Sequence, residues 1–318
     1  MRFLASRFGE SAVIVLCDQV ARILRMKFGV CVPNYGEYSV KDLRMIALEA
    51  ETLGYDSVWL TDHILMPRNS GTPYERILES LTCMAYLAPI TKRVKLGVSS
   101  LIIAMRNPVV AAKQLATIDN LSSGRVMLAI GAGWNETEFS TLGASFHDRG
   151  RRVDESINLI RALWSGEGQF QDGSRIRVSF RDVAFEPKPV QKRLTIWVGG
   201  VSEAAMRRAI ALGDAWHPNV FPMDEFKAMV TRFRDMPGGE KKEICVRIGI
   251  DSRSDRSEYI GAQGEKRVML SGNRKENGRI IDELASLGVG YMVVATSPDG
   301  KVPVESQFDS LRMIYSRA

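Results

Sequence analysis

From residue 26 onward, short apolar runs alternate regularly with amphipathic segments, and this pattern constrains the fold more than any other feature. The runs are rich in Val, Ile and Leu, and the segments between them place apolar residues at helical spacing. Apolar strands separated by helices are typical of a parallel sheet that is covered by helices. The predicted strands begin near residues 27, 57, 94, 125, 194, 214, 243 and 291.

Eight such units over residues 26–318 suit a closed α/β fold, the (β/α)8 TIM barrel. A doubly wound sheet would place a glycine-rich fingerprint after its first strand, but here Pro33-Asn34-Tyr35-Gly36 follows it. The barrel is therefore favoured. The predicted helices cover residues 39–53, 74–88, 108–121, 135–142, 150–164, 202–212, 223–234, 274–287 and 303–316.

Two segments depart from the alternation. Residues 165–193 hold two short β-like pieces, 175–180 and 182–186, and predict an insertion between strands 4 and 5. This insertion is either a lid or binding loop, or an edge hairpin that plugs one end of the barrel. Residues 1–25 contain a short apolar stretch without a cleavage site, whereas Met26 opens the first strand. We expect residues 1–25 to be an extension outside the fold and residues 26–318 to form a single barrel domain.

Composition narrows the function classes. The chain has 43 Lys and Arg against 37 Asp and Glu, and its 45% hydrophobic content is typical of a globular protein. Four cysteines stand far apart without a C-x-x-C pair, and free thiols fit the reducing cytoplasm, where we expect the protein. Three scattered histidines predict no metal site, and dispersed basic residues predict no nucleic-acid partner. No apolar run approaches the roughly 20 residues of a membrane helix.

Polar residues gather where the predicted strands end, which is where barrel enzymes carry their chemistry. His63 follows strand 2, and its imidazole titrates near neutrality, so it can donate or accept a proton. The adjacent Asp62 can hydrogen-bond a cofactor, although an Asp-His pair can also serve only as a helix cap. His217, within Trp-His-Pro, is either a pocket residue or packing, and His147 lies in a polar loop.

Two glycine-containing turns offer close backbone approach to a ligand. Gly199-Gly200-Val201-Ser202 leads from a strand into a helix, whose N-terminus favours an anion such as phosphate. The same residues also suit a tight turn. Gly131-Ala132-Gly133 lets a flat ligand approach strand 4, or forms a bulge.

Several longer stretches resemble the bacterial luciferase-like monooxygenase superfamily, in particular its branch of oxidoreductases that use the deazaflavin coenzyme F420. They are MKFGVCVPNYG, LGYDSVWLTDH, ITKRVKLGVSSLIIAMRNPVVAAKQLATIDNLSSGRVMLAIGAGWNETEF, RGRRVDESINLIRALWSGE, FEPKPVQ and IWVGGVSEAAMRRAIALGDAWHP. The resemblance covers nearly all of residues 26–220 and is looser beyond.

The resemblance implies a barrel with flavin or deazaflavin at its C-terminal rim. It places His63 at the substrate as the catalytic proton donor or acceptor, and a strand-3 bulge, often with a non-proline cis peptide, behind the ring. Trp134 stands where the F420-dependent sugar-phosphate dehydrogenases carry Glu, which argues against that substrate. The cofactor-binding residues implied are Asp62, Ser99, Ser100, Gly133, Asn135, Gly199, Gly200 and Ser202.

We therefore expect an F420-dependent oxidoreductase that transfers a hydride between the deazaflavin C5 and a small organic substrate, with a pocket lined by Tyr35, Trp134 and His217. An FMN-dependent monooxygenase that uses O₂ and a partner flavin reductase is the first alternative. A noncatalytic flavin-binding protein is the second. Relatives commonly form homodimers, so we expect a homodimer with no membrane partner.

Overall fold

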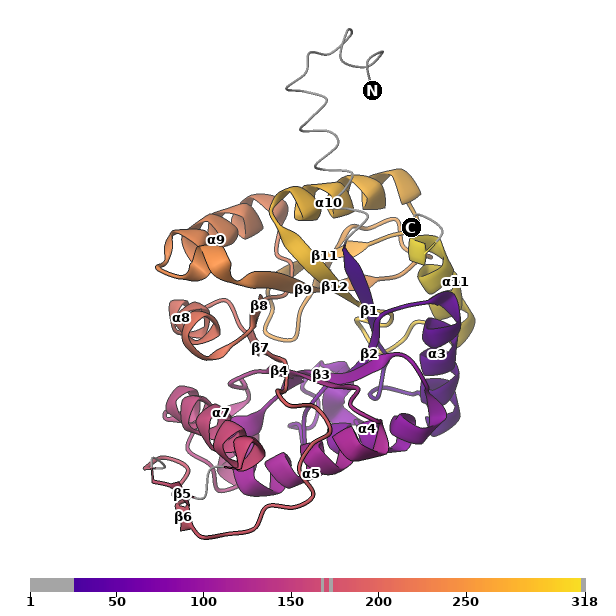
Figure 1. Ribbon diagram of the computed structural model, residues 1–318. Helices are drawn as coiled ribbons and strands as arrows, with labels where there is room; N and C mark the ends of the chain where they lie inside the picture. Colours follow the sequence, from indigo (N-terminus) through magenta and orange to yellow (C-terminus); the bar gives the residue numbers. More distant parts are fainter. Residues whose placement is uncertain (1–25, 167–168, 172–173, 316–318) are drawn as a thin grey trace, which may run out of the picture.

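Eight parallel strands close into a barrel in the computed structural model, which describes residues 26–166, 169–171 and 174–315 (Figure 1). Each strand pairs with the next, and the last pairs with the first, which confirms the predicted barrel. The predicted extension, residues 1–25, lies outside the described residues. The barrel strands are β1 (Lys27–Cys31), β2 (Ser57–Leu60), β3 (Lys95–Leu101), β4 (Val126–Ile130), β7 (Ile196–Gly199), β8 (Ala215–His217), β9 (Glu243–Ile250) and β12 (Val289–Ala295).

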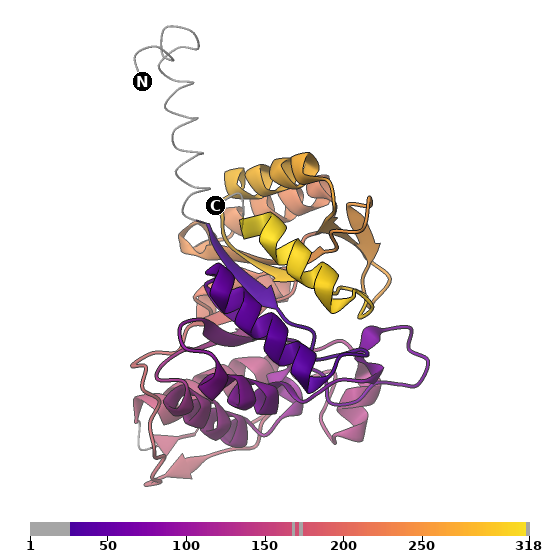
Figure 2. The same ribbon diagram turned by 90° about the vertical axis from the view of Figure 1, so that its right-hand side faces the viewer.

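Helices surround the strands, and the first and last of the described helices, α3 (Val40–Leu53) and α11 (Val304–Tyr315), lie side by side where the ring closes (Figures 1 and 2). One predicted boundary is wrong, because Pro73 opens only the 3₁₀ turn Pro73–Glu75. Helix α4 begins at Ser80, where the carboxylate of Glu79 accepts a hydrogen bond from the Thr82 amide. The helices are α3 (Val40–Leu53), α4 (Ser80–Ile90), α5 (Pro108–Leu121), α6 (Glu136–Thr141), α7 (Arg149–Ser165), α8 (Glu203–Leu212), α9 (Met223–Asp235), α10 (Arg274–Ser286) and α11 (Val304–Tyr315).

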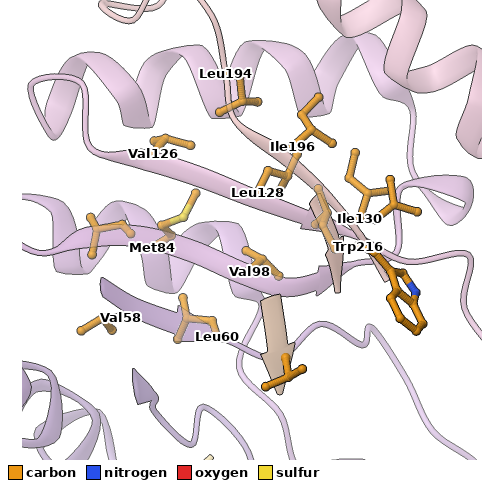
Figure 3. Packing of buried hydrophobic residues seen from close by; sticks show 14 of the residues in the cluster. Val58, Leu60, Met84, Val98, Val126, Leu128, Ile130, Leu194, Ile196 and Trp216 are labelled. Carbon is orange, nitrogen blue, oxygen red and sulfur yellow. The ribbon is translucent and has the colours of Figure 1, made fainter. Parts of the chain in front are cut away.

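The strands are buried on both faces, which explains their continuous apolar sequence. Residues that alternate along each strand, such as Val58 and Leu60, point outward and pack beneath the helices (Figure 3). Each such side chain contributes roughly 1.5–3 kcal/mol when fully buried. The intervening residues, among them Trp59 and Trp197, form a second cluster inside the barrel.

Two tryptophans fill the barrel beneath its rim. Trp59 and Trp197 stack with ring centroids 4.7 Å apart, and His217 lies 5.2 Å above Trp197. Glycines on the strands either side make the room, since a Cβ at Gly29 would lie 2.6 Å from Trp59 Nε1 and one at Gly97 only 2.4 Å from Trp59 Cε3. Open space therefore remains above this layer, at the C-terminal ends of the strands.

The insertion between β4 and β7 is an edge hairpin. It contains the two-stranded antiparallel pair β5 (Gln169–Phe170) and β6 (Phe180–Arg181), so the predicted β pieces 175–180 and 182–186 are wrong in position. The hairpin packs against the outside of α7 (Figure 1). None of its described residues lines the rim cavity described below, so the structure does not support the lid alternative.

A second hairpin, which the sequence did not predict, follows β9. It consists of β10 (Glu258–Ile260) and β11 (Lys266–Leu270), and β11 pairs in parallel with the outer end of β9. The short strand β8 pairs only with the beginning of β9, so β11 extends the barrel wall past the end of β8. This arrangement brings the hairpin turn over the rim. No helix in the described parts of the chain is long and apolar enough to cross a membrane.

Candidate active site

A cavity of about 160 Å³ opens at the C-terminal rim, and a second cavity of about 340 Å³ adjoins it. Tyr74, Arg247, Ala262 and Arg267 border both. Nine of the twelve predicted site residues line the first cavity, which therefore coincides with the predicted site. These nine are Asp62, His63, Ser99, Ser100, Gly133, Trp134, Gly199, Gly200 and His217.

His63 lies against the cavity wall with one ring nitrogen bound and the other free among the described residues. Its Nδ1–H donates to Glu138 Oε2 over 2.9 Å. The imidazole stacks on Tyr74, with centroids 5.1 Å apart, and meets the edge of Trp134 at 5.5 Å. Because Glu138 occupies Nδ1, Nε2 is the nitrogen available to a ligand. The ring is only 4% exposed, so a ligand reaches it from the cavity.

Glu138, on α6, is the principal residue that the sequence analysis missed. Its side chain is fully buried, and its Oε1 accepts hydrogen bonds from the amides of Ile64 at 2.5 Å and Leu65 at 3.3 Å. One carboxylate therefore fixes both the ring of His63 and the backbone that follows it. Two glutamates stand on this short helix, and the sequence offers no sign of which one reaches His63.

Asp62 is engaged by the protein itself. Its Oδ1 accepts hydrogen bonds from Ser80 Oγ at 2.7 Å and from Arg106 Nη2 at 2.6 Å, and its Oδ2 accepts from the Ile102 amide at 2.9 Å. Arg106 also pairs with Glu79 at 2.9 Å. The Asp62 side chain is inaccessible to solvent, so it holds together the loop after β3 and the start of α4.

The peptide bond between Ser99 and Ser100 is cis, as the resemblance implies. Ser99 Oγ lies 2.8 Å from Nε2 of His217, whose Nδ1–H donates to the Cys245 carbonyl over 2.6 Å. Since a carbonyl only accepts, Nε2 is the unprotonated nitrogen and the Ser99 hydroxyl donates to it. Burial lowers the pKa of His217 to about 4, so the ring is neutral near pH 7.

Small residues form one wall of the cavity. The side chain of Ser100 reaches across the ends of β4 and β7, where a Cβ on Gly131 would lie 3.1 Å from Ser100 Cβ and one on Gly199 would lie 2.7 Å from Ser100 Oγ. Gly133 and Gly200 have positive φ values of 81° and 112°, which other residues adopt at a cost. No long side chain projects from this wall.

Three predicted site residues lie elsewhere. Asn135 turns its amide to the sulfur of Met66, 3.3 Å away. Ser202 is exposed and caps α8 by accepting from the Ala205 amide. Tyr35 borders the second cavity, and its hydroxyl donates to the Ser297 carbonyl over 2.9 Å.

Arg247 was also missed, although the sequence contains a signal for it. In β9 the apolar residues Ile244, Val246 and Ile248 point outward, so the residues between them face the barrel interior. An arginine at an inward position of such a strand predicts a polar contact at the rim. No group of three or more His, Cys, Asp or Glu side chains suited to a metal ion occurs among the described residues.

A family model described as luciferase-like monooxygenase matches residues 26–260. The chain belongs to this family. As a luciferase-like protein it is an oxidoreductase of that type, and the resemblance inferred from the motifs is confirmed.

Relatives within the family differ in cofactor. An F420-dependent glucose-6-phosphate dehydrogenase of Amycolatopsis mediterranei is 39% identical over 137 residues, which are 41% of this chain and 40% of that protein. An FMNH(2)-dependent dimethylsulfone monooxygenase of Pseudomonas putida is 31% identical over 178 residues, which are 55% of this chain and 48% of that protein. The luciferase-like chain thus matches less than half the length of either relative.

A solved structure shows the same fold over a greater length. An F420-dependent secondary alcohol dehydrogenase, in complex with an F420-acetone adduct, superposes with a TM-score of 0.75 at 19% identity. The match covers 91% of this chain and 97% of that one. The hairpins β5–β6 and β10–β11 stand beside the eight strands of the barrel.

Proposed function

We propose that the chain is an F420-dependent oxidoreductase in which His63 moves a proton to or from a substrate oxygen. The observation that carries the proposal is the His63–Glu138 pair beside the wall of small residues at the barrel rim. Relatives and a structural neighbour that are named as F420-dependent support the choice of cofactor.

The residues at the rim fit a flat ring system. Serine and glycine at the ends of three neighbouring strands make up much of this wall, and Ile102 and Trp134 flank them, which leaves a flat patch between the two larger side chains. The hydroxyl of Ser99 donates its hydrogen bond to His217, so the hydroxyl oxygen can accept one from an N–H of a ligand. When bound, the deazaflavin supplies the hydride chemistry.

The chain itself supplies proton transfer and orientation. As an imidazolium, His63 donates its Nε2 proton to a carbonyl oxygen as that oxygen becomes a hydroxyl and is left as the neutral Nδ1–H tautomer; in the reverse direction Nε2 of the neutral ring takes up the hydroxyl proton. The Glu138 carboxylate accepts Nδ1–H throughout and stabilises the imidazolium when it forms. Tyr74 and Trp134 cover the imidazole and keep bulk water away from it.

The phosphate-binding part of the prediction rests on Gly199 and Gly200, which line the cavity. Glu203 occupies the first turn of α8 and pairs with Arg207 and Arg232. The Glu203 carboxylate lies at the N-terminus of α8, where the helix dipole is positive. A phosphate at this terminus would therefore be repelled by Glu203. We infer that the loop before α8, rather than the helix dipole alone, would hold a phosphate.

A second candidate is an FMN-dependent monooxygenase, because the dimethylsulfone monooxygenase relative is named for that cofactor. Titration of the purified chain with F420 and, separately, with FMN distinguishes the two, followed by quenching of tryptophan fluorescence. Trp134 lies on the cavity wall, and the Trp134→Phe variant identifies its share of the signal. Binding of FMN without F420 would overturn the proposed cofactor.

The role of His63 is tested in the His63→Asn variant, whose amide N–H retains a donor for Glu138. We expect kcat to fall by roughly 10²–10⁴-fold with the dissociation constant of F420 unchanged. An unchanged kcat with an accepted substrate would remove His63 from the chemistry.

A further inference from the structure

Arg247 stands at the boundary of the two cavities. Its guanidinium crosses the top of the barrel from β9, donating from Nη1 to the Ser99 carbonyl and from Nη2 to Thr61 Oγ1, 3.0 Å away. The residue is partly buried and lines both cavities. These two contacts leave other N–H groups of the guanidinium for a ligand.

Arg247 has no carboxylate within ion-pair distance among the described residues, unlike its cationic neighbours. Arg267 pairs with Glu265, and Arg106 pairs with Asp62 and Glu79. A guanidinium stays charged in proteins, and removing a charge even partly from water without a counter-charge costs free energy. The cavity wall at Arg247 is therefore complementary to an anion.

The other titratable groups near Arg247 do not supply that anion. They include Cys31, His217 and three tyrosines, Tyr35, Tyr74 and Tyr259, and none of them is a carboxylic acid. Burial raises the pKa of Tyr35 and of Tyr74 further. The negative charge has to come from outside the chain.

We propose that Arg247 binds the carboxylate of the substrate, and that the enzyme acts on organic acids with an aromatic or otherwise planar body. This inference rests on the proposed function. One unmatched positive charge suits a monoanion, and a guanidinium binds a carboxylate through parallel hydrogen bonds. The three tyrosines line the second cavity and supply apolar ring faces for the body of the substrate.

The remaining charges at the second cavity leave this balance unchanged. Asp299 and Lys301 both line its outer part and are opposite in sign. The Arg267 side chain borders the cavity with its charge matched by Glu265. Arg247 is thus the cation that decides which ligand charge is preferred.

Calorimetric titration of the purified chain with benzoate and benzamide tests this directly, since the two probes differ in charge but hardly in shape. We expect benzoate to bind at least roughly tenfold more tightly. The Arg247→Gln variant should lose this preference. The matched control Arg279→Gln makes the same charge change on the exposed face of α10 and should keep it.

Equal binding of the two probes, binding of neither, or a benzoate preference that persists in Arg247→Gln would overturn the inference. Arg247→Lys keeps the positive charge and replaces the glutamine variant if that variant does not fold. The lysine variant should retain part of the benzoate preference, and complete loss of the preference would count against the role of charge.

F420 titration of the same variants separates the two sources of an anion, the substrate and the cofactor. Weaker F420 binding with an intact benzoate preference would assign Arg247 to the cofactor, whereas failure of the wild type to bind F420 would overturn the proposed function alone.

Discussion

Acidification is expected to destabilise the protein through the buried imidazole of His217. Burial lowers the pKa of this ring from 6.5 to about 4 in the folded chain, and Nε2 already accepts a hydrogen bond from Ser99. The unfolded chain therefore takes up a proton at higher pH than the folded chain does. Stability that is fully present above pH 6.5 is lost progressively as the pH falls from 6.5 to about 4.

The size of the effect follows from the shift. One pKa unit corresponds to about 1.4 kcal/mol, so the full shift is worth about 3 kcal/mol below the folded pKa. Between pH 7 and pH 5 the loss is about 2 kcal/mol. His217 is 4% exposed, so solvent screening takes little from this figure.

Urea denaturation at pH 7 and at pH 5 measures the loss in the wild type, in His217→Gln and in His147→Gln. The His217 variant should lose about 2 kcal/mol less than the wild type between the two pH values, whatever its absolute stability. His147 is exposed and lies outside the rim cavity, so its variant gives the effect of removing one histidine elsewhere. Equal losses in wild type and His217→Gln would refute the reasoning.

Two further pairs of substitutions test the packing and the buried carboxylate. Gly97→Ala would place a Cβ 2.4 Å from Trp59 and should destabilise the barrel by about 1–3 kcal/mol. Gly290→Ala is the control, because a Cβ there has no heavy atom within 4 Å and its effect on stability should be near zero. Denaturation midpoints compare the two variants, and equal midpoints would contradict the packing argument. Glu138→Ala should cost about 3 kcal/mol because it leaves the buried His63 Nδ1–H and the part-buried amides of Ile64 and Leu65 without their acceptor, and Glu138→Gln should cost less. A wild-type midpoint for the alanine variant would show that the donors find other partners.

All eight barrel strands were predictable from the sequence, because a strand that is buried on both faces consists of a continuous run of apolar residues. It failed at the β10–β11 hairpin, since Glu258–Ile260 has only three residues and carries no apolar alternation. It also placed the start of α4 too early. Pro73 is compatible with a first helical turn, and only the tertiary structure shows that the helix begins at Ser80, after the N-cap residue Glu79.

The place of a residue at the rim was predictable where the strand end alone fixes it, as for His63 and Ser99, which both line the cavity. Partners that depend on distant segments were not predictable in this way. Asp62 was assigned to the cofactor, but its carboxylate is occupied by groups 18, 40 and 44 residues away along the chain. Glu138 is 75 residues from His63, and no local spacing records that contact.

The hairpin after β9 has a consequence for how this barrel can diversify. Pairing of β11 is confined to the outer end of β9, beyond the register that β8 and β9 share, and the family match ends at residue 260, within the hairpin. We therefore expect residues 251–273 to be exchangeable as one segment, with the eight-strand register and the His63–Glu138 pair left in place. Evolution, or a protein engineer, can change what enters the cavity by grafting this segment and leave the catalytic rim as it is.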